Sequence, residues 1–276
     1  APAEPSVAPA EPTAAQAEAT AAPAEPIVDW LDFDFDTRQV HAGEYPDKNT
    51  GLRVPPIALS AGYVFDRFDD QVDRFAGRSI DPIYSRQGNP TNSVAEERLA
   101  SLEGGTVSVA VSSGQAAISS ALFTLAQGGD HIVSTASIYG GTRILFGRSF
   151  KRFGIDVDYV WDAEDDAEWE RAIRPNTTAI YTETIPNPRN DVTDLRRIAA
   201  VAAKYHLPLI VDNTVGTPAI IRPFEHGANI VVHSTTKFLT GHGAAVGGAI
   251  VDGGNFDWEA AERAGRSFPL LTAPPR

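Results

Sequence analysis

Cysteine and methionine are both absent from the 276 residues of this chain. Without cysteine, the chain has no disulfide, no thiolate nucleophile and no cysteine-ligated metal. The six histidines include no His-x-x-x-His pair, so we expect no metal site. Because even an initiating methionine is missing, we expect residue 1 to lie inside a longer natural sequence.

Positive charge and long apolar runs are also scarce. There are 23 Lys and Arg against 36 Asp and Glu, a formal net charge of −13. This balance argues against nucleic acid or an anionic membrane as a partner. No apolar run approaches the ~20 residues that a membrane-spanning helix needs. We therefore expect a soluble, cytoplasmic protein.

The composition divides the chain into three parts. Residues 1–26 are an Ala/Pro/Glu-rich tract with little to bury, which predicts disorder. Residues 27–92 are rich in Pro, Gly and Asp, and we interpret them as an extended N-terminal arm. Residues 93–276 form the predicted α/β domain. Its last residues, 268–276, resemble a loop with no closing element, so we expect a truncated chain.

Helical and strand periods alternate from residue 93 onward. Helices are predicted over 93–103, 114–127, 141–153, 166–173 and 192–205. Strands are predicted over 107–111, 131–134, 155–160, 178–182, 207–211, 230–232 and 248–251. This alternation indicates an α/β fold: a mainly parallel sheet with helices on both faces. Ligands in such sheets bind at the carboxyl ends of the strands.

Lys237 is one of only four lysines, and it follows the apolar strand 230–232 through a cluster of small polar residues. Asp212 ends another apolar strand about 20 residues upstream. A buried lysine amine near a strand-end carboxylate suits Schiff-base chemistry with pyridoxal 5'-phosphate (PLP). Thr214, two residues after Asp212, could support this carboxylate as the partner of a protonated ring nitrogen. The alternatives are an ordinary surface lysine and a carboxylate that only caps a helix or turn.

Two strand-to-helix loops also carry candidate residues. Gly114 and Gln115 follow Ser112-Ser at a predicted helix start, where free N–H groups favour a phosphate. A plain N-cap is the alternative there. Tyr139 follows the strand 131–134, and its ring could stack on a flat heterocycle. The alternative is a partly buried tyrosine in a loop.

Further polar residues lie near these positions. Ser234 and Thr236 could donate to a phosphate, and Asn187 could bond a phenolic oxygen. Tyr84 and Arg86, in the arm, could form a phosphate clamp or an ordinary surface pair. Each residue taken alone is weak evidence, but the placement of most of them at the strand ends of one sheet favours a PLP site.

The chain resembles the Cys/Met-metabolism PLP enzymes of fold type I over roughly residues 37–275. The segments that carry the resemblance are Val40-His-Ala-Gly43, Ile83-Tyr-Ser-Arg-Gln-Gly-Asn-Pro-Thr91, Ser112-Ser-Gly-Gln115, Tyr139-Gly-Gly-Thr142, Val211-Asp-Asn-Thr214 and His233-Ser-Thr-Thr-Lys237. The implied architecture is the large domain of that fold, with the family's small C-terminal domain and its substrate-binding arginine missing.

The resemblance implies a role for each matching position. Lys237 would bond the cofactor covalently and shuttle protons, and Tyr139 would stack on the ring and assist the leaving group. Asp212 would pair with the pyridinium nitrogen. The remaining cofactor contacts would come from Gly114, Gln115, Ser234 and Thr236 at the phosphate, Asn187 at the ring oxygen, and Tyr84 and Arg86 from a neighbouring subunit. A site shared in this way would require a homodimer or homotetramer.

Within the family the resemblance is closest to the O-acetylhomoserine sulfhydrylase branch. Three segments favour this branch: Glu183-Thr-Ile-Pro-Asn-Pro, Gly241-His-Gly243 and Gly254-Asn-Phe-Asp-Trp258. The implied reaction is γ-replacement on O-acetylhomoserine by sulfide or a thiol, a step of methionine biosynthesis. The alternatives are cystathionine γ-synthase, cystathionine γ-lyase or methionine γ-lyase activity, and a truncated PLP-binding module without turnover.

Overall fold

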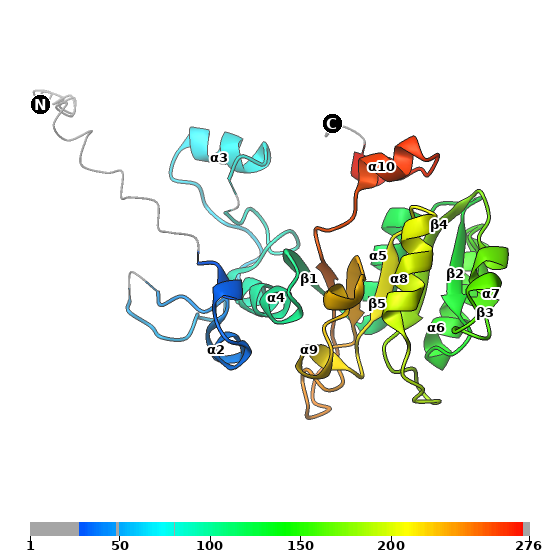
Figure 1. Ribbon diagram of the computed structural model, residues 1–276. Coiled ribbons are helices and arrows are strands. Elements are labelled where there is room, and N and C mark those ends of the chain that lie inside the picture. Colours follow the sequence, from blue (N-terminus) through cyan, green and yellow to red (C-terminus); the bar gives the residue numbers. More distant parts are fainter. Residues whose placement is uncertain (1–27, 48–49, 80, 273–276) are drawn as a thin grey trace, which may run out of the picture.

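The computed structural model describes residues 28–47, 50–79 and 81–272 of the chain. The tract 1–26, for which the sequence predicts disorder, lies outside the described residues. Figure 1 shows a sheet flanked by helices, with the N-terminal arm extending away from it. The strands are β1 (Val107–Val111), β2 (His131–Thr135), β3 (Asp156–Val160), β4 (Thr177–Glu183), β5 (Leu209–Asp212), β6 (Ile230–His233) and β7 (Gly248–Asp252).

The strand order is β1-β7-β6-β5-β4-β2-β3. Pairings from β6 through β5, β4 and β2 to β3 are parallel, whereas β7 is antiparallel to both β6 and β1. Since β1 and β6 are each antiparallel to β7, β1 runs in the same direction as β6. The carboxyl ends of β1, β2, β4, β5 and β6 therefore meet at one edge of the sheet. The prediction of a mainly parallel sheet is confirmed.

Helices cover both faces of the sheet (Figure 1). They are α4 (Pro90–Glu103), α5 (Gly114–Leu125), α6 (Gly140–Ile144), η2 (Leu145–Phe150), α7 (Asp166–Ala172), α8 (Leu195–Lys204), α9 (Thr217–Ile220), η3 (Pro223–His226), α10 (Trp258–Arg263) and α11 (Pro269–Thr272). One core joins α5, η2 and α10 to the sheet, and a second core joins α4, α7 and α8.

Neighbouring residues of each buried strand enter opposite cores. Ile132 belongs to the α5 core, whereas Val133 belongs to the α8 core. Tyr181 and Ile180 divide in the same way on β4. This alternation follows from the two-residue period of a strand, and burial on both faces explains the continuous apolar runs in the sequence.

Capping residues set the ends of the main helices. Ser113 accepts a hydrogen bond from the amide of Ala116 and starts α5, and Asp194 caps α8 in the same way. The predicted helix 192–205 therefore begins later, at Leu195. Gly104, with φ of 79°, ends α4 in the left-handed conformation that glycine adopts freely.

Two segments, one predicted helix and the arm, differ in secondary structure from the expectation. The segment predicted as one helix over 141–153 is a short α-helix, α6, that continues into the π-helix η2. The arm contains η1 (Trp30–Asp32), α2 (Phe35–His41) and α3 (Phe68–Phe75), so it is not extended throughout. Phe35 and Val40 of α2 do not share one helical face, so a periodicity argument cannot detect that helix. Phe68, Val72 and Phe75 of α3 do follow the helical period, so this helix could have been predicted from the sequence. The division at residues 26 and 92 into separate parts remains a prediction.

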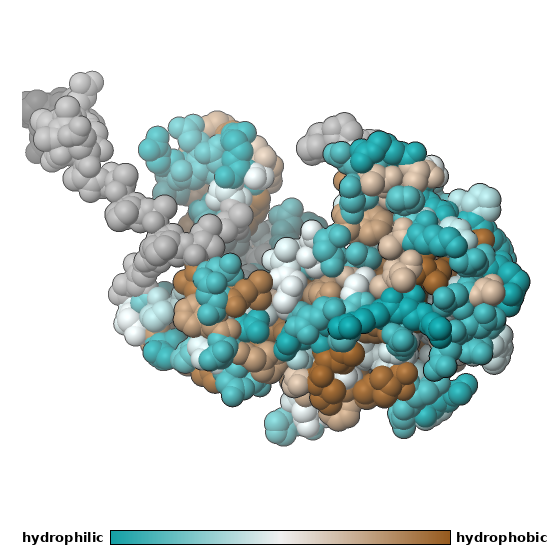
Figure 2. All heavy atoms as spheres, in the orientation of Figure 1, coloured by the Kyte–Doolittle hydropathy of each residue, from teal (hydrophilic) through white to brown (hydrophobic). Residues whose placement is uncertain are grey.

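The arm leaves many apolar side chains exposed. Leu59 is 94% exposed and Val64 is 88% exposed, and Ile57, Phe68 and Phe75 are also on the surface. In Figure 2, brown atoms gather on the side where Figure 1 places α2 and α4. Among the described residues, no helix combines the length and apolar character needed to cross a membrane.

Candidate active site

Parallel pairing brings the ends of β4, β5 and β6 side by side. Glu183 at the end of β4 lies opposite Asp212 at the end of β5, and Asp212 lies opposite Val232 of β6. The loops that follow these strands carry the predicted residues Asn187, Thr214 and Ser234. The sheet thus gathers residues that are separated by about 20 to 30 positions in the sequence.

Asp212 is buried, with only 9% of its surface exposed. Its Oδ1 accepts a hydrogen bond of 2.9 Å from the amide of Thr214, and its Oδ2 lies 3.4 Å from the hydroxyl of Tyr181. Burial raises the pKa of Asp212, and the hydrogen bonds from Thr214 oppose that rise. Since the Tyr181 contact is long, Oδ2 retains capacity for a stronger donor, such as a protonated ring nitrogen.

The N-terminus of α5 packs directly against the loop after β6. A Cβ added at Gly114 would lie 2.6 Å from the Cβ of Ser234, so only glycine allows this approach. The amide of Ser234 in turn donates to the Oγ1 of Thr214 at 2.8 Å. Gly114, Thr214 and Ser234 are therefore brought together at the free N–H groups of α5, where an anion is favoured.

Gln115 and Thr236 take different positions around this point. The Nε2 of Gln115 donates to the Oγ1 of Thr142 at 3.3 Å, which links α5 to α6. The Oγ1 of Thr236 donates to the carbonyl of Gly247 at 3.2 Å and accepts from its amide at 3.1 Å. Gln115 lies in the first turn of α5 and Thr236 in the loop after β6, both at the same edge of the sheet as Ser234.

Tyr139 is held through its backbone. Its amide donates to the Oε1 of Glu183 at 2.7 Å, while its ring is 46% exposed. Burial of Glu183, together with the neighbouring carboxylate of Asp212, raises the pKa of Glu183 to about 8. The expectation of a tyrosine free to stack on a bound ring fits this arrangement, in which the ring itself is available.

Lys237 is exposed, so the expectation of a buried amine is wrong for this chain. The apolar residues after it, Phe238 and Leu239, are exposed as well and form no cover over the lysine. The backbone amide of Lys237 donates to the carbonyl of Ser234 at 3.3 Å, which fixes the lysine one turn after the loop that contacts Gly114. Lys237 therefore lies at the same edge of the sheet as Asp212 and Ser234, but it is exposed to solvent.

Three predicted residues lie apart from this cluster. Asn187 is exposed, although its backbone amide supports Glu183. Tyr84 and Arg86 are exposed in the arm, where the Arg86 guanidinium lies 5.6 Å from the Tyr84 ring. The structure brings neither of these two arm residues to the α5 N-terminus of their own chain through a hydrogen bond or ion pair between described residues.

Sequence reasoning missed several members of the cluster. Thr142 and Tyr181 link Gln115 toward Asp212, and burial raises the pKa of Tyr181 well above its usual value, so it remains a donor. In the sequence, Glu183 stands out only as the first residue of a segment that favours the sulfhydrylase branch. Glu183 ends a strand whose central residues, Ala179-Ile-Tyr181, are apolar, so the sequence already indicated that its carboxylate would need a partner once buried.

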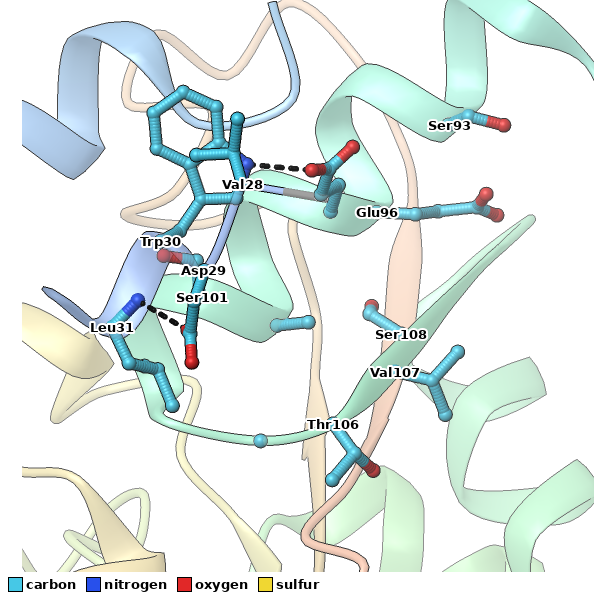
Figure 3. A pocket seen from close by; sticks show the side chains of 13 residues that line it. Val28, Asp29, Trp30, Leu31, Ser93, Glu96, Ser101, Thr106, Val107 and Ser108 are labelled. Carbon is cyan, nitrogen blue, oxygen red and sulfur yellow. Dashed lines mark hydrogen bonds between the residues drawn. The ribbon is translucent and has the colours of Figure 1, made fainter. Parts of the chain in front are cut away.

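A separate hollow of about 510 Å³ lies elsewhere on the molecule. It is lined by η1, α4 and the start of β1, with Trp30 bonded to Glu97 across it (Figure 3). Thr106 and Val107 mark the amino end of β1, which is the edge opposite to Asp212 and Ser234. This hollow does not belong to the strand-end cluster.

The strand-end cluster fits pyridoxal phosphate. It offers a buried carboxylate with a free bonding direction, a helix N-terminus that approaches a serine, and a nearby exposed ring. Residues 36–267 match the family described as Cys/Met metabolism PLP-dependent enzyme. The chain belongs to this family, and the resemblance inferred from the motifs is confirmed.

Within the family, the similar proteins include sulfhydrylases. The chain is 46% identical over 240 residues to an O-acetyl-L-homoserine sulfhydrylase of Corynebacterium glutamicum, covering 87% of this chain and 55% of that protein. It is also 46% identical over 243 residues to a homocysteine/cysteine synthase of Saccharomyces cerevisiae, covering 87% of this chain and 54% of that protein. The chain thus spans about half the length of these curated relatives.

Solved structures share the fold. A Campylobacter jejuni protein assigned as an O-acetylhomoserine (thiol)-lyase, with a pyridoxyl-lysine phosphate, superposes with a TM-score of 0.78 at 37% identity. That match covers 81% of this chain and 55% of the other. The cystathionine γ-lyase of Lactobacillus plantarum superposes with a TM-score of 0.73 at 36% identity, covering 84% of this chain and 57% of the other. The expected fold-type I architecture is therefore confirmed.

Proposed function

We propose that this chain forms the cofactor-binding part of a PLP-dependent γ-replacement enzyme. The enzyme would act on O-acetylhomoserine with sulfide to give homocysteine and acetate, or with methanethiol to give methionine and acetate. The observation that carries the proposal is the strand-end cluster, in which buried Asp212 lies beside the contact between α5 and Ser234. The sulfhydrylase relatives supply the substrate class.

The residues of this chain would divide the work by position. Asp212 would hold a proton on the ring nitrogen, while Thr214 keeps its carboxylate in place. Gly114, Gln115, Ser234 and Thr236 would bind the phosphate, and Asn187 the ring oxygen. Tyr139 would stack on the ring, and Lys237 would bond the cofactor and move the α-proton. When bound, the cofactor would supply an electron sink for the substrate carbons.

We also propose that two or four copies share their sites in the cytoplasm. Tyr84 and Arg86 would bind the phosphate of the neighbouring copy. Both residues are exposed, and within the described residues no hydrogen bond or ion pair joins them to the α5 N-terminus of their own chain, which supports this role. The exposed apolar residues of the arm, Leu59 and Val64 among them, support a contact with another copy.

The Lys237→Ala variant tests the cofactor assignment. We expect the purified chain with added pyridoxal phosphate to show the visible absorbance of a lysine-bound cofactor, and the variant to lose it. Lys204→Ala is the matched control, because Lys204 is an exposed lysine paired with Glu170 at 2.6 Å. Retention of the band in Lys237→Ala, or its loss in Lys204→Ala, would refute the assignment.

A second candidate activity is that of cystathionine γ-lyase, since the L. plantarum enzyme superposes nearly as well as the thiol-lyase. Product analysis separates the two. We expect homocysteine from O-acetylhomoserine and sulfide, and no 2-oxobutyrate from cystathionine. The opposite pattern would favour the lyase. Binding of the cofactor without either product would identify the chain as a PLP-binding module.

A further inference from the structure

Glu103 is a fully buried carboxylate at the end of α4, far in sequence from the strand-end cluster. The C-terminus of a helix carries the negative end of the dipole, so an acidic residue is unfavourable there. A buried carboxylate also loses its hydration. Helix stability therefore does not explain why an acidic residue is buried at this position. Its hydrogen-bond partners offer the explanation.

A single oxygen of Glu103 accepts from two residues, one at the end of β6 and one directly after β5. Its Oε1 lies 2.9 Å from the Nδ2 of Asn213 and 2.6 Å from the Nε2 of His233. Both partners are also fully buried. We call Glu103, Asn213 and His233 the Glu103 cluster. It joins α4 to β5 and β6 across sequence separations of 110 and 130 residues.

The two partners are the immediate neighbours of cofactor-binding candidates. Asn213 follows Asp212, and His233 precedes Ser234. Asn213 is fixed further by its bonds to Thr184, at 3.0 Å, and to the carbonyl of Ile221, at 2.8 Å. The Glu103 cluster therefore sets the backbone on which the ring-binding carboxylate and the phosphate-binding hydroxyl are mounted.

We propose that Glu103 is a positioning residue that holds the Asp212 and Ser234 loops at the separation that the cofactor requires. The proposal rests on the proposed function, since Asp212 and Ser234 are the residues that would bind the ring and the phosphate. Glu103 itself touches neither. Its Oε2 and the Nδ1 of His233 have no partner among the described residues, so the bonds through Oε1 carry the link.

Hydrogen exchange of the cofactor-free chain tests the link without any activity. In Glu103→Ala, we expect exchange to become at least about tenfold faster in peptides covering 209–216 and 230–237, because both loops lose a buried acceptor. Glu103→Gln keeps an oxygen acceptor and should leave exchange within about threefold of the original chain. Glu97→Ala is the control, since Glu97 on the same helix bonds Trp30 and Tyr45 instead.

The dissociation constant of pyridoxal phosphate supplies the second measurement. We expect it to rise at least about tenfold in Glu103→Ala, and to change less than about threefold in Glu103→Gln and Glu97→Ala. If Glu103→Ala does not fold, His233→Ala removes only the β6 bond, which is the one side-chain hydrogen bond that His233 makes among the described residues. It should speed exchange in 230–237 but not in 209–216.

Three results would overturn the proposal. One is unchanged exchange in both peptides of a folded Glu103→Ala chain. The second is faster exchange spread evenly over the sheet, which would indicate a general loss of stability. The third is faster local exchange with an unchanged dissociation constant. Failure of the original chain to bind pyridoxal phosphate would instead refute the proposed function, while the exchange data would still decide whether Glu103 holds the two loops.

Discussion

At the scale of single residues, the site combines two carboxylates with one backbone contact. Glu183 and Asp212 are neighbours across β4 and β5, and Glu183 also accepts from the amide of Tyr139. One buried acid therefore affects both the electrostatics around Asp212 and the position of Tyr139. This double role makes Glu183 the most informative residue for a pH experiment.

Glu183 should make the stability of the cofactor-free chain depend on pH. Burial, first, and the charge of Asp212 raise its pKa from 4.5 to about 8. Between those values the folded chain holds a proton that the unfolded chain has released, so stability falls as pH rises through this window. The slope from one such group is at most about 1.4 kcal/mol per pH unit.

Glu183→Gln checks this expectation in urea-unfolding experiments between pH 5 and about pH 8. The variant cannot ionise, so its free energy of unfolding should fall less steeply with pH than that of the original chain. Its side-chain oxygen can still accept from the Tyr139 amide. Equal slopes in the two proteins would show that Glu183 does not titrate in this window.

At the scale of elements, the close approach of α5 to the β6 loop is the decisive contact. Gly114→Ala would place a methyl group against Ser234, and overpacking of this kind costs about 1–3 kcal/mol. We expect a lower free energy of unfolding and weaker retention of pyridoxal phosphate. Equilibrium denaturation and dialysis against buffer measure the two effects.

Gly147→Ala is the matched control for that change. Gly147 lies in the helical segment η2, and an added Cβ would meet nothing within 4 Å. The free energy of unfolding should stay equal or rise by up to about 1 kcal/mol. A Gly114→Ala chain as stable as the Gly147→Ala chain would show that the α5 contact tolerates a side chain.

At the scale of the whole molecule, the arm is the part whose apolar side chains a single copy leaves exposed. Leu59 and Val64 stay almost fully exposed, and burial of such side chains stabilises an assembly by roughly 25 cal/mol per Å². We expect Leu59→Asp to shift the chain toward smaller species in sedimentation experiments. Its thermal unfolding as a monomer should not change.

Val192→Asp serves as the comparison, since Val192 is also exposed but lies in the loop after β4. We expect its sedimentation to match that of the original chain. A monomeric original chain, or equal effects of the two substitutions, would contradict the role of the arm in assembly.

The sequence by itself determined the sheet and most of its helices. The strand 107–111 agrees with the structure at both ends, because the apolar run and its flanking Gly and Ser residues are local signals. The positions of Asp212 and Ser234 at strand ends were equally local. The short arm helix α2 escaped prediction because its two apolar residues do not share a helical face. Helix α3 escaped although Phe68, Val72 and Phe75 lie at helical spacing, because it is only eight residues long and lies in a segment rich in Pro, Gly and Asp.

Only the tertiary structure decided which residues meet. Parallel pairing placed Glu183 against Asp212, and the packing of α4 placed Glu103 between Asn213 and His233. No local signal encodes a contact across 110 or 130 residues, because it arises when separate elements pack into one core. The exposure of Lys237 has the same origin: Phe238 and Leu239 after it are apolar, yet burial depends on what packs over them, and in this chain both remain exposed.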